Sequence, residues 1–170
     1  MKPLACIACI FTAVLFTSSS FAQQVSKTKS KSPDPNSVVI QTVSPVDTAA
    51  VERITGVKGK YNNGEYKITI PQNDLDVEVD GFKIIPAMGL GTWIDFAPAP
   101  GGTMIMGDLI LTETDLKPVQ QEVIRQGLTI TAIHNHFVRN HPNVMYMHVG
   151  GTGSTEALAT RAKEIGRAHV

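Results

Sequence analysis

Three histidines in the last third of the chain have the type and spacing of metal ligands. His134 and His136 are two residues apart in TAIHNH, and His148 follows in VMYMHV. Residues two apart share one face of a β-strand, so His134 and His136 are expected to point the same way. If the two segments pair with His134 opposite His148, all three imidazoles converge on one sheet face. A slip of one residue would move His148 to the other face.

Three imidazoles that leave a fourth position open form the ligand set of a catalytic zinc site. We therefore predict a divalent transition metal at His134, His136 and His148, with zinc favoured. Copper, nickel or iron would accept the same ligands. Two other interpretations stay open: a hydrogen-bonded structural or interface cluster, and metal-free acid/base catalysis. His141, beside Pro142 in the intervening turn, is expected to be exposed and outside the cluster.

Few other residues have the spacing of a catalytic or cofactor site. Asp108 is the first carboxylate to examine for an orienting contact with a histidine, although it is expected to end a strand and to cap a nearby helix. The Gly-rich segment GGTGS lacks the lysine of a nucleotide loop, and Ser154 lacks a nucleophile elbow. No cofactor loop and no hydrolase triad are predicted, and the catalytic residues, if any, are unknown.

Capping and turn signals predict the elements that precede the histidine segments. Asp47 and Gly56 are residue types that begin and end a helix. Asn63-Gly64 is typical of a hairpin turn between two strands, and a second hairpin is expected at Asp80-Gly81. Trp93, in the strand that follows, is expected to anchor the core.

The second half of the domain reads strand, helix, strand, strand, helix. The first of these helices is predicted from the capping-box pair Thr112 and Asp115 to Gly127, with Pro118 tolerable only in its first turn. GGTGS is interpreted as a turn, and Ser154 as the cap of the last helix. This order predicts an α+β fold with a partial ferredoxin-like split β-α-β pattern, preceded by a short helix and small antiparallel strands. The closing strand of that pattern is expected either to lie beyond the end of this sequence or to be absent.

The ends of the chain carry processing signals. Residues 1–22 have the positive start, apolar run and small-residue cleavage site of a secretory signal peptide, which predicts a periplasmic or extracellular protein. Residues 23–45 are a flexible Ser/Lys/Pro linker, and 46–163 form the domain. Residues 164–170, EIGRAHV, match the translation of a common sequencing adapter, so we expect them to be non-native and the native C-terminus to be missing. His169 therefore drops out of the site.

The charge balance excludes some partners. The chain has 15 basic and 15 acidic residues, so no basic field predicts nucleic-acid binding. Both cysteines lie in the signal peptide, and the mature chain would have no disulfide and no membrane anchor after cleavage.

Several longer segments carry a family resemblance. DTAAVERITGVKGKYNNGEYKITIP, PAMGLGTWIDF, MGDLILTETDLKPVQQEVIRQGLTITAIHNH and VMYMHVGG resemble the bacterial LppY/LpqO-like family, across about residues 47–163. The resemblance implies an exported protein, and a second tandem copy of the domain as a partner, but no established activity. The chain departs from the family in lacking a lipid-attachment cysteine. Because the resemblance implies no activity, two alternatives stay open. The protein is either an enzyme or a binding domain whose histidine-bearing face packs on a second copy or a partner.

Overall fold

The computed structural model describes residues 43–168. The predicted signal peptide, most of the predicted linker and His169 lie outside this range. None of the helices within it is long and apolar enough to cross a bilayer.

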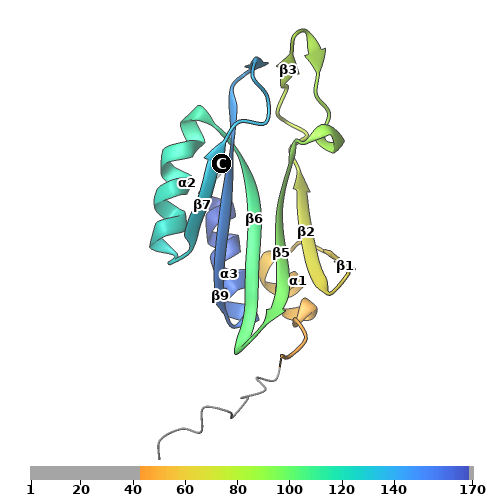
Figure 1. Ribbon diagram of the computed structural model, residues 1–170, viewed down its shortest axis with the longest axis vertical. Helices are drawn as coiled ribbons and strands as arrows, with labels where there is room; N and C mark the ends of the chain where they lie inside the picture. Colours follow the sequence, from red (N-terminus) through yellow and green to blue (C-terminus); the bar gives the residue numbers. More distant parts are fainter. Residues whose placement is uncertain (1–42, 169–170) are drawn as a thin grey trace, which may run out of the picture. The chain divides into compact units, whose positions relative to one another are not determined.

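A six-stranded sheet, antiparallel throughout, forms one layer of the domain (Figure 1). Its spatial order is β1-β2-β5-β6-β9-β7. The strands are β1 (Lys60–Asn62), β2 (Glu65–Pro71), β5 (Gly91–Ala99), β6 (Gly102–Thr112), β7 (Thr129–His134) and β9 (Val144–Gly153). The long central pair β6–β9 runs from Thr103↔Gly153 to Thr112↔Val144 and holds the residues that matter most below.

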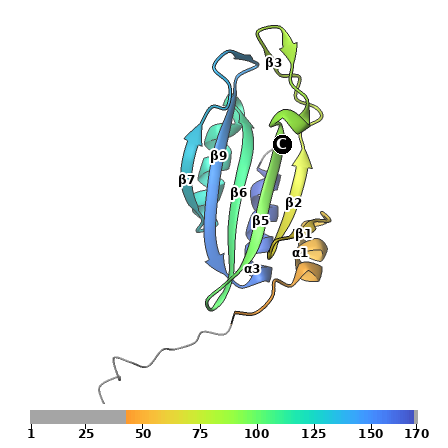
Figure 2. The ribbon, with the colours of Figure 1, turned by 45° about the vertical axis from the view of Figure 1, so that its right-hand side comes forward.

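Three helices cover one face of this sheet: α1 (Thr48–Thr55), α2 (Glu113–Arg125) and α3 (Thr155–Arg167). α3 lies behind the strands in both Figure 1 and Figure 2, and α2 stands beside β7 in Figure 1 and behind β7 and β9 in Figure 2. Each begins at a side-chain cap, in which Asp47, Thr112 and Ser154 accept backbone N–H bonds. Because the caps sit directly after strands or loops, the chain turns back over the sheet at these points.

The main core lies between the helices and the sheet. Phe96, Ile105 and Leu109 point from the strands toward Val119 and Leu158 of the helices, and all five are buried. Alternation along β6 places every second side chain in this core and leaves the others on the opposite face. We call that opposite face the open face.

A second, smaller core covers one end of the open face. It lies beneath a three-stranded sheet of order β4-β3-β8 and a 3₁₀ turn. These elements are β3 (Glu78–Val79), β4 (Phe82–Lys83), η1 (Pro86–Met88) and β8 (Asn140–His141). Leu90, Ile110 and Tyr146 are buried there. This core gives the open face an apolar wall beside the histidines.

The predicted α+β class is confirmed. The neighbours β6, β9 and β7, with α2 and α3, are compatible with the partial split β-α-β order. The place beside β6 that a closing strand would take is occupied by β5, which comes earlier in the chain. Both predicted hairpins form, with positive φ at Asn63-Gly64 and Asp80-Gly81.

Four local predictions are wrong. Trp93 does not anchor the core, because its register with Asp108 turns it to the open face, whereas Phe96 is fully buried. GGTGS is not a turn, because β9 continues through Gly153 in register with β6. Pro118 lies in the second turn of α2 rather than the first. Asp108 does not end its strand.

The last helix extends past the predicted domain boundary at 163. Glu164–Arg167 continue α3, and Ile165 is buried in the main core. The non-native origin of residues 164–170 stays a prediction.

Candidate functional site

The three predicted histidines come together on the open face. His134 ends β7, His148 lies in β9, and their Nε2 atoms are 3.0 Å apart. The ring of His136 lies 5.0 Å from the ring of His134, measured between centroids. This separation is that of a hydrogen bond between the two Nε2 atoms, and the tautomers of the rings set which of them donates.

The register that unites them differs from the predicted one. His134 pairs with Tyr146, and His148 pairs with Ala132. The shift from the predicted pairing is two residues, so it preserves the face, whereas a shift of one would have separated the histidines. A bulge between Ile130 and Ala132 interrupts the β7–β9 ladder.

His136 reaches the cluster from a loop rather than from the predicted strand. β7 ends at His134, and His136 follows two residues later in irregular backbone. Its ring stacks on Tyr146 with centroids 3.5 Å apart and planes 12° apart. Tyr146 is itself fixed, since its hydroxyl donates to the Gly89 carbonyl at 2.9 Å. The sequence placed Tyr146 on the His148 face but offered no signal for its contact with Gly89.

Asp108 supplies the carboxylate of the cluster. It pairs in register with His148, and its Oδ2 lies 3.5 Å from Nε2 of His148 and 3.9 Å from Nε2 of His136. The residue is only 6% exposed. Its Oδ1 is buried and has no hydrogen-bond partner among the described residues. The contact to histidine suspected from the sequence is therefore present, whereas the capping role belongs to Thr112.

Burial dominates the electrostatics of this group. Desolvation raises the pKa of Asp108, and the nearby charges of His148, His136 and His134 oppose that rise. Desolvation also lowers the pKa of His136, against the attraction of Asp108. Both groups thus favour their neutral forms unless another charge compensates the buried carboxylate.

The spacing of the donor atoms is close to that of a tetrahedral site. Ligand bonds of about 2 Å place neighbouring ligand atoms about 3.3 Å apart. The contacts here are 3.0 Å for His134–His148, 3.5 Å for His148–Asp108 and 3.9 Å for His136–Asp108. The first distance is shorter than this value and the other two are longer. Within residues 43–168, no group of three or more His, Cys, Asp or Glu side chains is arranged as a metal site.

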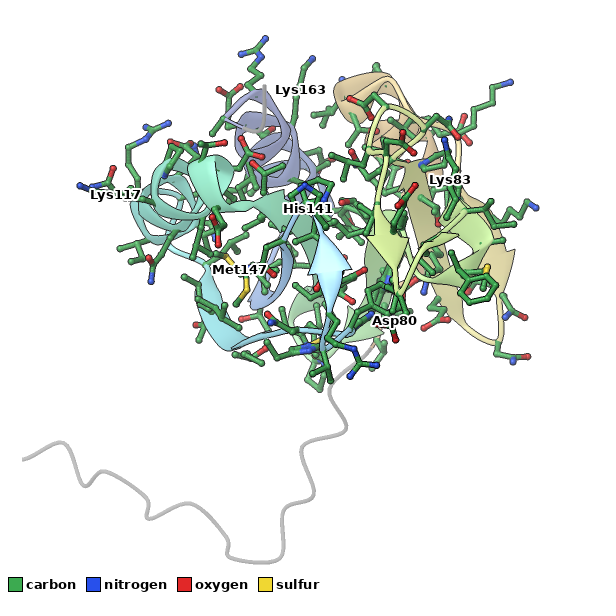
Figure 3. The ribbon with its side chains drawn as sticks, turned by 90° about the horizontal axis from the view of Figure 1, so that it is seen from above. Asp80, Lys83, Lys117, His141, Met147 and Lys163 are labelled. Carbon is green, nitrogen blue, oxygen red and sulfur yellow. The ribbon has the colours of Figure 1, made fainter. Side chains whose placement is uncertain are left out.

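The remaining candidates lie outside the cluster. His141 is exposed in β8, as expected, and pairs with Glu78 (Figure 3). Ser154 caps α3 by accepting from the Ala157 N–H. Neither residue has the surroundings of a catalytic group.

The model of a family described as Domain of Unknown Function (DUF1259) matches residues 49–168. No curated protein and no solved structure matches the chain.

Proposed function

We propose a metal-binding role for this chain, which belongs to the family described as Domain of Unknown Function (DUF1259). In this role one divalent transition metal, with zinc favoured, is held by His134, His136 and His148. Asp108 lies beside them, either as the fourth donor or next to a metal-bound water. The observation that carries the proposal is a buried carboxylate with two imidazole nitrogens beside one oxygen, a third imidazole nitrogen 3.0 Å from one of these, and no partner for its second oxygen in the described residues.

A cation resolves the electrostatic problem of the cluster. A carboxylate taken out of water is costly unless it is paired and hydrogen-bonded. The ion-pair partners of Asp108 within residues 43–168 are two histidines, with Nε2 atoms at 3.5 Å and 3.9 Å from its Oδ2. A divalent ion would compensate Asp108, use the nitrogens of all three histidines, and replace the His134–His148 hydrogen bond with two metal bonds.

The choice of chemistry depends on Asp108. Direct ligation by its carboxylate closes the tetrahedral set, which is typical of binding or structural zinc. Three histidines alone leave a position for water, whose pKa zinc lowers to about 7, and Asp108 would then lie beside that water as a proton acceptor. The proposal covers metal binding and leaves the reaction unassigned.

A second candidate is a non-enzymatic binding domain. On the open face, Met104 and Met106 are 40% and 39% exposed, and Met106 lies two residues before Asp108 on β6. In this candidate that face packs on a second copy of the domain or on a partner. LppY/LpqO-like membership, with export to the periplasm or outside the cell, is compatible with both candidates.

Elemental analysis of the untagged protein tests the metal proposal. We expect about one transition-metal ion per chain in the wild type, and loss of that ion in His134→Ala. His141→Ala is the matched control, since His141 is exposed and outside the cluster, and it should keep the metal. Zinc at one hundred times its Kd should add about 2.7 kcal/mol to the free energy of unfolding.

Two results would reject the metal proposal. One is the absence of a bound metal together with unchanged stability in zinc, copper or nickel. The other is equal metal loss in His134→Ala and His141→Ala. Concentration-dependent association that Met106→Lys abolishes, in a chain without metal, would favour the second candidate instead.

A further inference from the structure

A pocket lined by lysines lies on the open face, at the edge of the six-stranded sheet that β1 and β2 form. Its volume is about 430 Å³, and its lining residues are Lys58, Gly59, Lys60, Lys67, Thr69 and Pro71. Lys60 pairs with Lys67, and Lys67 pairs with Asp95, which is two residues from Trp93 on β5. Paired residues share a face, so this pocket opens on the open face.

The backbone that carries Lys58 and Lys60 is held tightly against β2. The Gly59 N–H donates to the Tyr66 hydroxyl at 2.8 Å, and that hydroxyl donates to Glu52. A Cβ at Gly59 would lie 2.6 Å from the Lys67 carbonyl oxygen, which no real side chain tolerates. The pocket wall is therefore preorganised, and little backbone ordering would oppose the binding of a ligand.

The positive charge of the pocket is only partly compensated. The Nζ of Lys67 pairs with Asp95 at 3.2 Å and lies 3.7 Å from the centre of the Trp93 ring. Lys58 and Lys60 form no salt bridge within residues 43–168, and no acidic residue lines the pocket. Glu65, on the same face at the hairpin end, is the nearest acid along the strand. Because the whole chain is formally neutral, this is a local concentration of positive charge.

The pocket and the histidine cluster share one row of the sheet. Thr69 pairs with Trp93, Trp93 pairs with Asp108, and Asp108 pairs with His148. Neighbouring strands are about 4.8 Å apart, so the row spans roughly 14 Å from Thr69 to His148. The Trp93 ring lies between the two sites on this face.

We propose that Lys58, Lys60 and Lys67 bind a phosphate group of a soluble ligand that lies across Trp93 on the open face. Three ammonium donors and a rigid wall match the charge and hydrogen-bonding capacity of an oxyanion. The binding of phosphate at the lysines does not require a metal. That the rest of the ligand extends to the histidine cluster rests on the proposed function.

Trp93, the only tryptophan in the sequence, provides a built-in reporter. An anion that moves the Lys67 ammonium away from the Trp93 ring should change the fluorescence emission of Trp93. We would titrate inorganic phosphate into the full chain in EDTA at constant ionic strength, following both Trp93 fluorescence and the heat of binding. EDTA keeps the phosphate result separate from the presence or absence of a metal.

The variants decide whether the pocket is responsible. The double variant Lys58→Gln/Lys60→Gln should weaken phosphate binding at least tenfold. The control is Lys117→Gln/Lys163→Gln, because those lysines project from α2 and α3 in the other layer (Figure 3). Three results would overturn the proposal: no saturable heat in the wild type, equal weakening in the control, or binding to phosphatidylglycerol vesicles without binding to inorganic phosphate.

Discussion

Asp108→Asn should stabilise the metal-free domain while removing its affinity for metal. The side chain is 9% exposed, and its Oδ1 has no hydrogen-bond partner in the described residues. Asparagine has nearly the same shape, carries no charge, and can donate from its amide to His148. A residue that costs stability in the free protein and is needed only with the ligand is typical of a binding site.

The magnitude follows from burial and its partial compensation. A buried polar group without a partner costs about 1–3 kcal/mol, and more when it is charged. The nearby charges of His148, His136 and His134 offset part of this cost. We therefore expect a net gain of about 1 kcal/mol in the free energy of unfolding, or roughly 3–5 °C in Tm for a domain of this size.

The gain should depend on pH with a definite sign. Burial raises the pKa of Asp108 in the folded state above its ordinary value of 3.8. The folded protein then binds more protons than the unfolded chain between these two pKa values, so the wild type loses stability as the pH rises through them. The variant lacks this loss. Its advantage should be small below pH 3.8 and fully present above the folded-state pKa of Asp108.

Urea unfolding in EDTA, followed by circular dichroism at several pH values, measures the difference. Zinc titrations of the same proteins after removal of the EDTA should raise the Tm of the wild type and leave that of the variant unchanged. Asp95→Asn is the matched control, because Asp95 is paired with Lys67 and its neutralisation should bring no gain. A lower Tm for Asp108→Asn in EDTA would refute the reasoning, since it would mean that the ionised carboxylate stabilises the metal-free fold.

Three further outcomes follow from the fold. Tyr146→Phe should lower the free energy of unfolding by about 1–2 kcal/mol in urea titrations, because the Gly89 carbonyl loses its donor. Burial raises the pKa of Tyr146 to about 12, which an alkaline absorbance titration of its ionisation would check. The stability that this shift contributes should persist to pH 10 and be lost as the pH rises to about 12. Phe96→Ala should cost about 3–5 kcal/mol by thermal denaturation, whereas Trp93→Ala should cost far less, since only Phe96 is fully buried.

Local signals predicted the elements well because they act within a few residues. Asp47, Thr112 and Ser154 cap their helices as expected, and Asn63-Gly64 turns its hairpin. Such signals depend on the hydrogen-bonding capacity of one side chain or on the freedom of one backbone position. The turn predicted at the glycines after His148 is wrong. Glycine is typical of turns, but these glycines continue a strand paired with β6.

Interactions between distant strands were harder to predict. Trp93 is large and apolar, and nothing in the neighbouring sequence indicates its pairing with Asp108. That pairing turns the Trp93 side chain away from the helices. The same holds for the contact of Tyr146 with Gly89, which joins residues 57 positions apart. Both depend on pairings that no local pattern specifies.

The sequence alone determined the α+β class, the caps and turns, and the histidines that merit attention, because these follow from residue type and from a period of two along a strand. Only the tertiary structure decided that His136 reaches the cluster from a loop and that Asp108 joins it. It also decided that the lysines of β1 and β2 lie on the same face. The physical reason is that strand register is set by the packing of whole side-chain sets against the core, and each one-residue step exchanges the two faces.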